Sequence, residues 1–250
     1  MRSHQISFFI KTLSILLFCF SANAVAETKW WEEGGDLLNN LLSSDKASEL
    51  TVGDMGDGLK EALRVGTDTV VKQLGTNDGF NKDPKVHIPL PKSLDKVKSV
   101  LKPIGYSNML DDLELKLNRS AEAATPKAKK IFWDAISQMT IKDVKGIFNG
   151  PDDAATRYLQ AKMSQPLKDE MRPVVYNSMA EVGAIQSYDK MMAQYSAIPF
   201  VPDVKANLTD HVLQKALDGI FHYLAIEEAS IRKNPAKRTT ELLQRVFGSK

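Results

Sequence analysis

Cysteine and histidine are scarce in this 250-residue chain. Cys19 is the single cysteine, and there are only four histidines. One cysteine cannot form an intramolecular disulfide, so we expect a buried hydrophobic core to stabilise the fold. A chain of this length can form such a core, because it buries roughly 70% or more of the surface that its unfolded form exposes.

Net charge is nearly absent as well. The chain has 33 basic and 31 acidic residues, which give a formal charge of +2. Arg2 and Lys11 lie in the first 26 residues, which contain no acidic residue, so 33 minus 2 leaves 31 basic residues against 31 acidic ones in the rest. The excess of positive charge that is typical of nucleic-acid-binding proteins is therefore missing after residue 26. We expect no nucleic-acid partner.

Motifs of the common enzyme and metal-binding classes are also missing. The chain has no Glu-x-x-His pair, no His-Glu-x-x-His helix and no Gly-rich phosphate loop. Ser-x-x-Lys strings occur, among them those that begin at Ser93, Ser99 and Ser230, but the Ser-Asp-Asn and Lys-Thr-Gly motifs that accompany a nucleophilic serine are absent. We therefore expect no catalytic residue, no cofactor and no metal site, and favour a protein that is not an enzyme.

The N-terminus, by contrast, carries a clear pattern. Arg2 precedes the apolar run Leu13–Phe20, and Ala24-Val25-Ala26 supplies the small residues of a cleavage site. The uncharged run is shorter than the roughly 20 residues that span a membrane. We predict a signal peptide over residues 1–26, cleaved after Ala26 or Ala24, and an exported, periplasmic protein with no transmembrane anchor after cleavage. Because Phe18 stands where a lipoprotein signal has a small residue, we do not expect lipidation of Cys19.

Residues 27–55 differ in composition from the rest of the chain. They contain the pair Trp30-Trp31, and a stretch rich in Ser, Asp and Gly runs from Ser43 to Gly58, as is typical of a linker. We predict a flexible N-terminal arm in which Trp30 and Trp31 dock onto a partner, since tryptophan suits interfaces and membrane surfaces. The alternative is that both tryptophans fold back into the core.

From residue 56 to residue 250 the apolar residues recur with helical spacing, and no segment alternates convincingly with period two. Pro126 and Pro166 suit the first turn of new helices, and the extended piece Val86–Pro91 is the only segment that resembles a strand. We predict an all-α, single multi-helix domain of short antiparallel helices with longer C-terminal helices. The expected helices cover about 59–74, 94–101, 110–124, 126–139, 141–148, 153–163, 166–198, 203–232 and 235–247.

A few polar residues on these helices could form a buried polar network. Asp218 and His222 are four residues apart and so share a helical face, for which an ordinary contact is a simpler interpretation than a ligand site. The candidates for such a network are Arg119, Glu122, Asp134, Asp218 and His222.

Several short stretches resemble an uncharacterised family of exported bacterial all-helical proteins, a domain of unknown function. The resemblance covers nearly all of residues 56–250 and implies no activity, cofactor or site residue. The stretches are Gly58–Leu63, Ile88–Pro91, Asn118–Glu122, Asp153–Thr156, Lys215–Gly219 and Phe247-Gly248.

Two hypotheses about function follow. The first is a non-catalytic periplasmic protein of the bacterial envelope that binds an envelope protein or another envelope component. The alternative is a periplasmic carrier that holds an apolar small molecule or lipid between its helices, which nine methionines would suit. No motif identifies the ligand, the partner or the oligomeric state.

Overall fold

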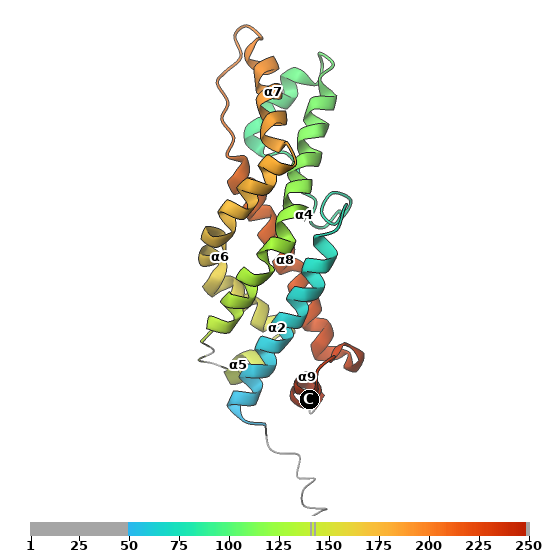
Figure 1. Cartoon of the computed structure of the whole chain (residues 1–250), viewed down its shortest axis with the longest axis vertical. Coiled ribbons are helices and arrows are strands. Elements are labelled where there is room, and N and C mark those ends of the chain that lie inside the picture. The colour runs from blue at the N-terminus through green and yellow to red at the C-terminus, as the bar shows by residue number, and fades with distance from the viewer. Residues whose placement is uncertain (1–49, 141, 143, 249–250) are drawn as a thin grey trace, which may run out of the picture. The chain divides into compact units, whose positions relative to one another are not determined.

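The computed structural model describes residues 50–140, 142 and 144–248, and every regular element among them is a helix (Figure 1). The predicted all-α single domain is thus confirmed. The expected signal peptide and the Trp30-Trp31 pair lie outside the described residues. No helix in the described part of the chain combines the length and the apolar character needed to cross a membrane. The α-helices are α2 (Val52–Leu74), α3 (Asp95–Leu101), α4 (Ser107–Gln138), α5 (Val144–Asn149), α6 (Ala154–Glu181), α7 (Ala184–Ser196), α8 (Leu208–Lys233) and α9 (Glu241–Gly248), with short 3-10 helices at Lys92–Leu94 and Pro235–Lys237.

Helices α2, α4, α6 and α8 form a four-helix bundle in which each packs on the next and α8 packs on α2. Their directions alternate, so the bundle is antiparallel (Figure 1). Helices α5 and α9 pack on the bundle near the start of α2, whereas α3 and α7 pack along the first half of α4. The side chains between the helices are almost wholly buried, and Phe132 of α4 meets Phe221 of α8 edge to face at 5.8 Å between ring centroids.

Helix α2 begins earlier than its composition suggested. The structure has helix from Val52, so the predicted linker is wrong for residues 52–58 and the domain starts before residue 56. The reason is a capping box: the Thr51 hydroxyl accepts from the Asp54 N–H at 3.0 Å, and the Asp54 carboxylate accepts from the Thr51 N–H at 3.1 Å. Gly58 is also buried here, because α9 passes close to α2 at this point.

Helix α4 is one continuous helix of 32 residues, so the prediction of two short helices divided at Pro126 is wrong. A proline inside a helix removes one backbone hydrogen bond and costs about 3 kcal/mol or more. A buried stripe runs without interruption through the proline, and burial of this stripe outweighs that cost. Its members include Leu117, Ala121, Ala124, Ala128 and Phe132.

Helix α6 likewise continues through Pro166, which was expected to open a new helix, and through Pro173. The helical run that was predicted to reach Ile198 is divided instead at Gly183, whose φ of 77° separates α6 from α7. The prediction of short helices is thus wrong for the centre of the chain. There, the burial of apolar side chains outweighs the tendency of proline to end a helix.

Helix α8 starts at Leu208 and not at Asp203, because the Asn207 side chain accepts from the Asp210 N–H at 3.0 Å and caps the helix there. The five residues before it form part of an extended loop. At the C-terminus Asn234 caps only a short 3-10 turn that opens with Pro235, and α9 follows as a separate helix from Glu241. The prediction of one continuous helix over residues 235–247 is therefore wrong.

Candidate docking surface at one end of the bundle

Two of the five predicted network residues, Arg119 and Glu122, form an ion pair. Arg119 Nη1 donates to Glu122 Oε2 at 2.6 Å, and Glu122 is buried. Glu122 Oε1 accepts from the backbone N–H groups of Phe80 and Asn81 at 3.1 and 3.0 Å, and Arg119 Nη2 donates to Asp78 at 2.7 Å. Hydrogen bonds from Lys82, Asn81 and Arg119 hold the pKa of the Asp78 carboxyl well below its usual range. The pair therefore fastens the loop after α2 onto α4.

The other three network candidates lie apart from this pair and are exposed. Asp134 pairs with Lys130 at 2.5 Å, Asp218 accepts from Gln214 at 2.7 Å, and His222 meets the ring of Tyr223 edge to face. In the described ranges of the chain, no three His, Cys, Asp or Glu side chains come together in an arrangement that could hold a metal ion.

The extended piece at residues 86–91 bonds to side chains instead of to a strand. Asn118 of α4 accepts from the Ile88 N–H at 2.9 Å and donates to the Ile88 carbonyl at 2.8 Å. Glu114, one turn away, accepts from the Leu90 N–H at 3.0 Å, and His211 of α8 contacts the Pro89 carbonyl at 2.8 Å. These bonds satisfy backbone groups that a β-ladder would otherwise pair.

A second buried ion pair, which the sequence reasoning missed, joins three helices. Glu228 of α8 is 0% exposed and accepts from the N–H groups of Ala155 and Thr156 at 3.0 and 2.7 Å, so it caps the start of α6. Arg232 donates to Glu228 at 2.7 Å and to the Phe148 carbonyl at the end of α5 at 2.9 Å. The only signal in the sequence is a Glu and an Arg at i and i+4 within an apolar helical face. Both ion pairs bind backbone groups at loops and helix ends, so they hold separate segments of the fold together.

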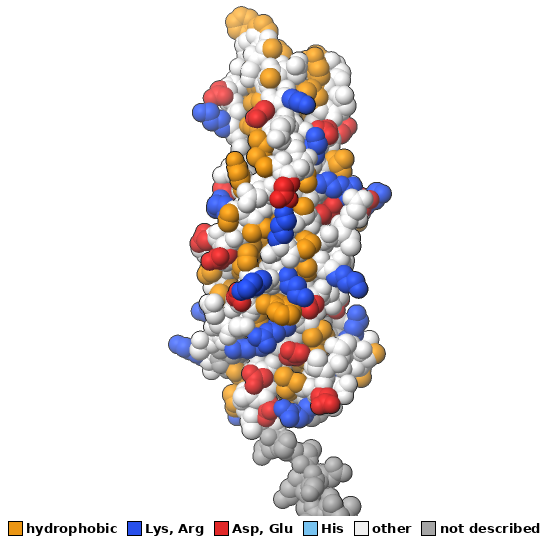
Figure 2. Space-filling view, in the orientation of Figure 1, with side chains coloured by type: hydrophobic (Ala, Val, Ile, Leu, Met, Phe, Trp, Pro, Cys, Tyr) orange, Lys and Arg blue, Asp and Glu red, His pale blue; other side chains and the backbone are white. Residues whose placement is uncertain are grey.

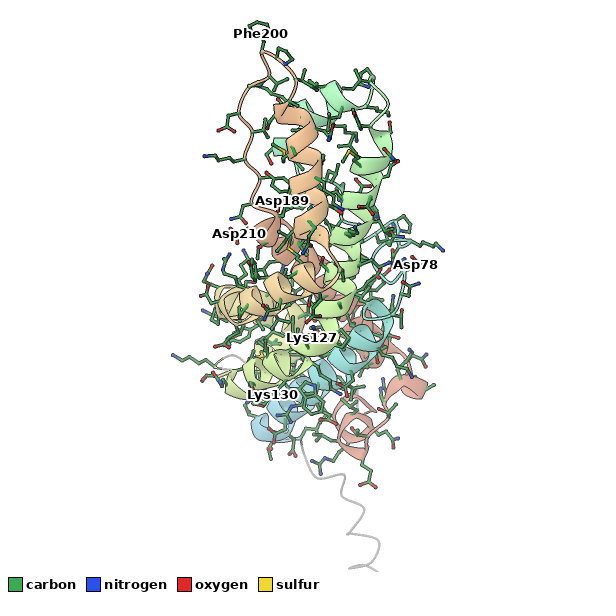
Figure 3. The ribbon with its side chains drawn as sticks, turned by 45° about the horizontal axis from the view of Figure 1, so that its top comes forward. Asp78, Lys127, Lys130, Asp189, Phe200 and Asp210 are labelled. Atoms are coloured by element: carbon green, nitrogen blue, oxygen red, sulfur yellow. The ribbon has the colours of Figure 1, made fainter. Side chains whose placement is uncertain are left out.

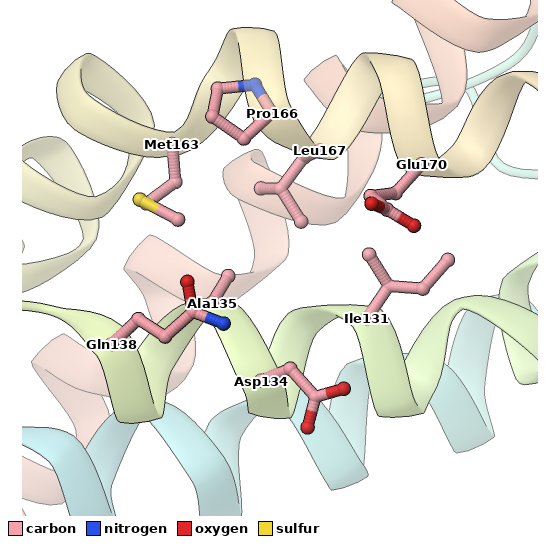
Figure 4. A pocket seen from close by; sticks show the side chains of 8 residues that line it. All are labelled: Ile131, Asp134, Ala135, Gln138, Met163, Pro166, Leu167 and Glu170. Carbon is pink, nitrogen blue, oxygen red and sulfur yellow. The ribbon is translucent and has the colours of Figure 1, made fainter.

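A recess between α4 and α6 is a candidate ligand site for the carrier hypothesis (Figure 4). Its volume is about 210 Å³, below the roughly 300–1,000 Å³ of typical small-molecule pockets. Other recesses of the described surface have volumes of about 380–460 Å³, but each is more open to solvent. Asp134 and Glu170 lie on opposite sides of it, and Met163 lies at one end. Most of the other methionines of the bundle are buried in its core, namely Met139, Met171, Met179 and Met191.

The described surface carries one concentration of exposed apolar residues, at the end of the bundle formed by α3, α7 and the start of α4. We call it the apolar end and define it as residues 103–106 and 197–202. Phe200 is fully exposed (105%), Ile104 is 55% exposed and Tyr106 is 36% exposed. Both loops lie at the same end in two views, with Phe200 at the tip (Figures 1 and 3).

Hydrogen bonds to two tyrosine side chains hold the loop that carries Phe200 in place. The buried Tyr195 of α7 donates its hydroxyl hydrogen to the Pro202 carbonyl at 3.0 Å, and the Ala206 N–H donates to the Tyr188 hydroxyl at 3.3 Å. Pro199 and Pro202 restrict the backbone on either side. Phe200 itself has a φ of 66°, a conformation that costs a bulky residue of order 1–3 kcal/mol. The local structure thus holds an apolar side chain out into solvent.

The other loop of the apolar end is a tight helix termination. Gly105 has a φ of 94°, its N–H donates to the Lys102 carbonyl at 3.2 Å, and the Tyr106 N–H donates to the Leu101 carbonyl at 3.1 Å. This pair of bonds is a Schellman motif, which turns the chain sharply between α3 and α4. Ile104 and Tyr106 flank the glycine and are exposed as a result.

No charged residue interrupts either part of the apolar end. Residues 103–110 and 191–202 contain no Asp, Glu, Lys or Arg. In Figure 2 the tip of the bundle is hydrophobic or neutral, and the first charged side chains appear below it. Sequence reasoning did not identify this site; the signal that could have revealed it is the uncharged stretch of twelve residues ending in Ile-Pro-Phe-Val-Pro.

Comparison with known proteins gives one match. Residues 49–248 match the model of a family described as a protein of unknown function, DUF4197. Searches among curated proteins and among solved structures gave no match.

Proposed function

The chain belongs to the DUF4197 family, whose description assigns no activity, and we propose that it is a non-catalytic interaction protein of the cell envelope. Its docking surface is the apolar end. The observation that carries the proposal is Phe200, which is fully exposed on a loop that two tyrosine hydroxyls and two prolines hold in place. Contact with an apolar partner surface would bury this side chain, which is worth about 1.5–3 kcal/mol for a phenylalanine.

The carrier alternative has less support. Four methionines fill the core, and the recess between α4 and α6 is small. The ion pairs Arg119–Glu122 and Glu228–Arg232 form hydrogen bonds with backbone groups of loops and helix ends. These bonds favour a structural role for the two pairs over a catalytic one.

The export of the chain to the periplasm is part of the same proposal, and it rests on the composition of residues 1–26. Sequencing the N-terminus of the protein isolated from its own cells tests it. A first residue of Glu27 or Val25 supports export, and a chain that starts at Met1 contradicts it.

Docking can be tested by placing the photo-crosslinking residue benzoylphenylalanine at position 200 in cells. The control carries it at position 176, because Tyr176 is an aromatic residue on α6 that is also well exposed (53%) but lies outside the apolar end. We expect a discrete protein or lipid adduct from position 200 and none from position 176. Equal labelling from both positions, or none from either, would contradict the proposal.

A further inference from the structure

We propose that the apolar end inserts shallowly into the surface of an anionic phospholipid bilayer. This inference rests on the proposed docking function and names its partner. The occupant is a lipid surface and not a second protein or a second copy of the chain.

The shape and chemistry of the end favour a lipid surface. Phe200 lies at the tip of the bundle (Figure 3), and Ile104 is exposed on the second loop of the same end. A fully exposed side chain such as Phe200 protrudes from its surroundings and is not part of a flat patch with a polar rim. Protein interfaces typically surround an apolar centre with polar groups that make about one hydrogen bond per 100–200 Å². A bilayer needs no such match, since its acyl boundary accepts protruding apolar side chains of any pattern. Tyr106, which is partly exposed beside them, has the amphipathic ring that suits the boundary between acyl chains and headgroups.

The charges just behind the tip favour an anionic surface. Around the second loop, residues 95–112 contain three exposed lysines, Lys96, Lys98 and Lys102, and three exposed acids, Asp95, Asp111 and Asp112. Asp112 is paired with Lys116 at 3.0 Å, which leaves a small excess of positive charge near this loop. On the other loop Asp203 and Lys205 lie 4.0 Å apart and balance each other. The lysines are thus placed where lipid headgroups would lie if Phe200 and Ile104 entered the acyl boundary, and lysines near an anionic leaflet are attracted to it.

The rigidity of the loops lowers the cost of insertion. Binding a mobile loop to a membrane would require ordering it, which opposes association. The hydroxyl bonds of Tyr195 and Tyr188 and the Schellman motif at Gly105 fix both loops before any contact. The two apolar side chains are therefore presented without further ordering.

The test uses flotation of the processed full chain, isolated as it accumulates in the cell, with vesicles of phosphatidylethanolamine and phosphatidylglycerol at 3:1. The disruptive variant is the double substitution Phe200→Asp and Ile104→Asp, and the matched control is Tyr176→Asp. We expect binding by the unmodified chain, a loss of roughly tenfold or more in the double variant, and no loss in the control. Substituting two of these lysines, Lys98→Glu and Lys102→Glu, should weaken binding to these vesicles but not to neutral phosphatidylcholine vesicles.

A second measurement locates the contact. With Cys19 removed by processing or replaced by Ser, a cysteine introduced at position 200 carries an environment-sensitive NBD label, and a second chain carries it at position 176. Vesicles should raise and blue-shift the emission at position 200 only. Absence of vesicle binding, or equal losses in the double variant and the control, would overturn the inference.

These outcomes separate the inference from the proposed function. A crosslink from position 200 to a defined protein, or to a second copy of the chain, without vesicle binding overturns the lipid partner and leaves docking intact. No vesicle binding and no position-specific crosslink overturns both.

Discussion

Removing the carboxylate of Glu228 should destabilise the domain far more than removing any exposed carboxylate. Glu228→Ala leaves Arg232 buried without its counter-charge and takes away the acceptor for the N–H groups of Ala155 and Thr156. Breaking a buried pair by deleting one partner costs about 3–5 kcal/mol. For a domain of about 200 residues, each kcal/mol lowers the melting temperature by about 2–4 °C.

The measurement is urea denaturation followed by circular dichroism, with the free energy of unfolding and its urea dependence determined for each variant. Asp134→Ala is the control, because the pair of Asp134 with Lys130 is exposed and such pairs contribute about 0–1 kcal/mol. The double variant Glu228→Leu and Arg232→Met should recover only part of the loss, since an apolar pair of similar volume avoids the unpaired charge but leaves the N–H groups of Ala155 and Thr156 without an acceptor. A loss below about 1 kcal/mol for Glu228→Ala would refute the reasoning.

Three further predictions concern strain, packing and pH. Phe200→Asn should raise the free energy of unfolding by about 1 kcal/mol, because asparagine tolerates the positive φ at this exposed position. A clear loss of stability in thermal denaturation would argue against backbone strain at position 200. Gly58→Ala should lower the free energy of unfolding by about 1–3 kcal/mol, since its added methyl would lie 2.6 Å from a side chain of α9. Gly56→Ala should be neutral or stabilising, because the nearest atom to its added methyl is 3.6 Å away. Equal effects of the two substitutions in denaturation would contradict this packing. Hydrogen bonding by Ser187 lowers the pKa of Asp112, so the folded state binds fewer protons than the unfolded state, and this stabilisation is present above about pH 4 and lost as pH falls through the folded pKa. Asp112→Asn should therefore flatten the fall in stability between about pH 5 and pH 2, and an unchanged slope would count against it.

Much of the fold follows from apolar spacing, because that spacing reports the buried face of each helix. Leu59, Leu63 and Leu74 were placed correctly on α2, and the helices α3, α5 and α9 follow the same pattern. The predicted helix boundaries at proline were wrong. A proline inside a helix costs a few kcal/mol, and the sequence alone does not show the packing in the assembled bundle that outweighs this cost. Pro126 lies inside a helix for this reason.

The contacts that join distant segments could not be predicted. Local rules assign the cap of α6 to Asp153, but its N–H groups are satisfied by Glu228, more than 70 residues further along. The residues near position 155 contain no pattern that predicts a contact with Glu228. Arg119 and Glu122 were selected as polar residues on one helix, yet their role depends on the loop at residues 78–81, which the sequence places far away.

The apolar end was missed for a related reason. A stretch such as Ile198–Pro202 has the composition of core, and only the placement of the loop beyond the end of α7 exposes Phe200. Exposure of a side chain is a property of the whole fold, so a single sequence does not distinguish an apolar loop that docks from one that is buried.

Hydrogen–deuterium exchange of the chain in the presence of its own envelope membranes tests the docking surface most directly, because it maps contact without assuming the partner. We expect slower exchange in peptides that cover residues 102–110 and 196–206, and unchanged exchange in α6 around Tyr176. Protection confined to the recess between α4 and α6, or no protection at the apolar end, would contradict it.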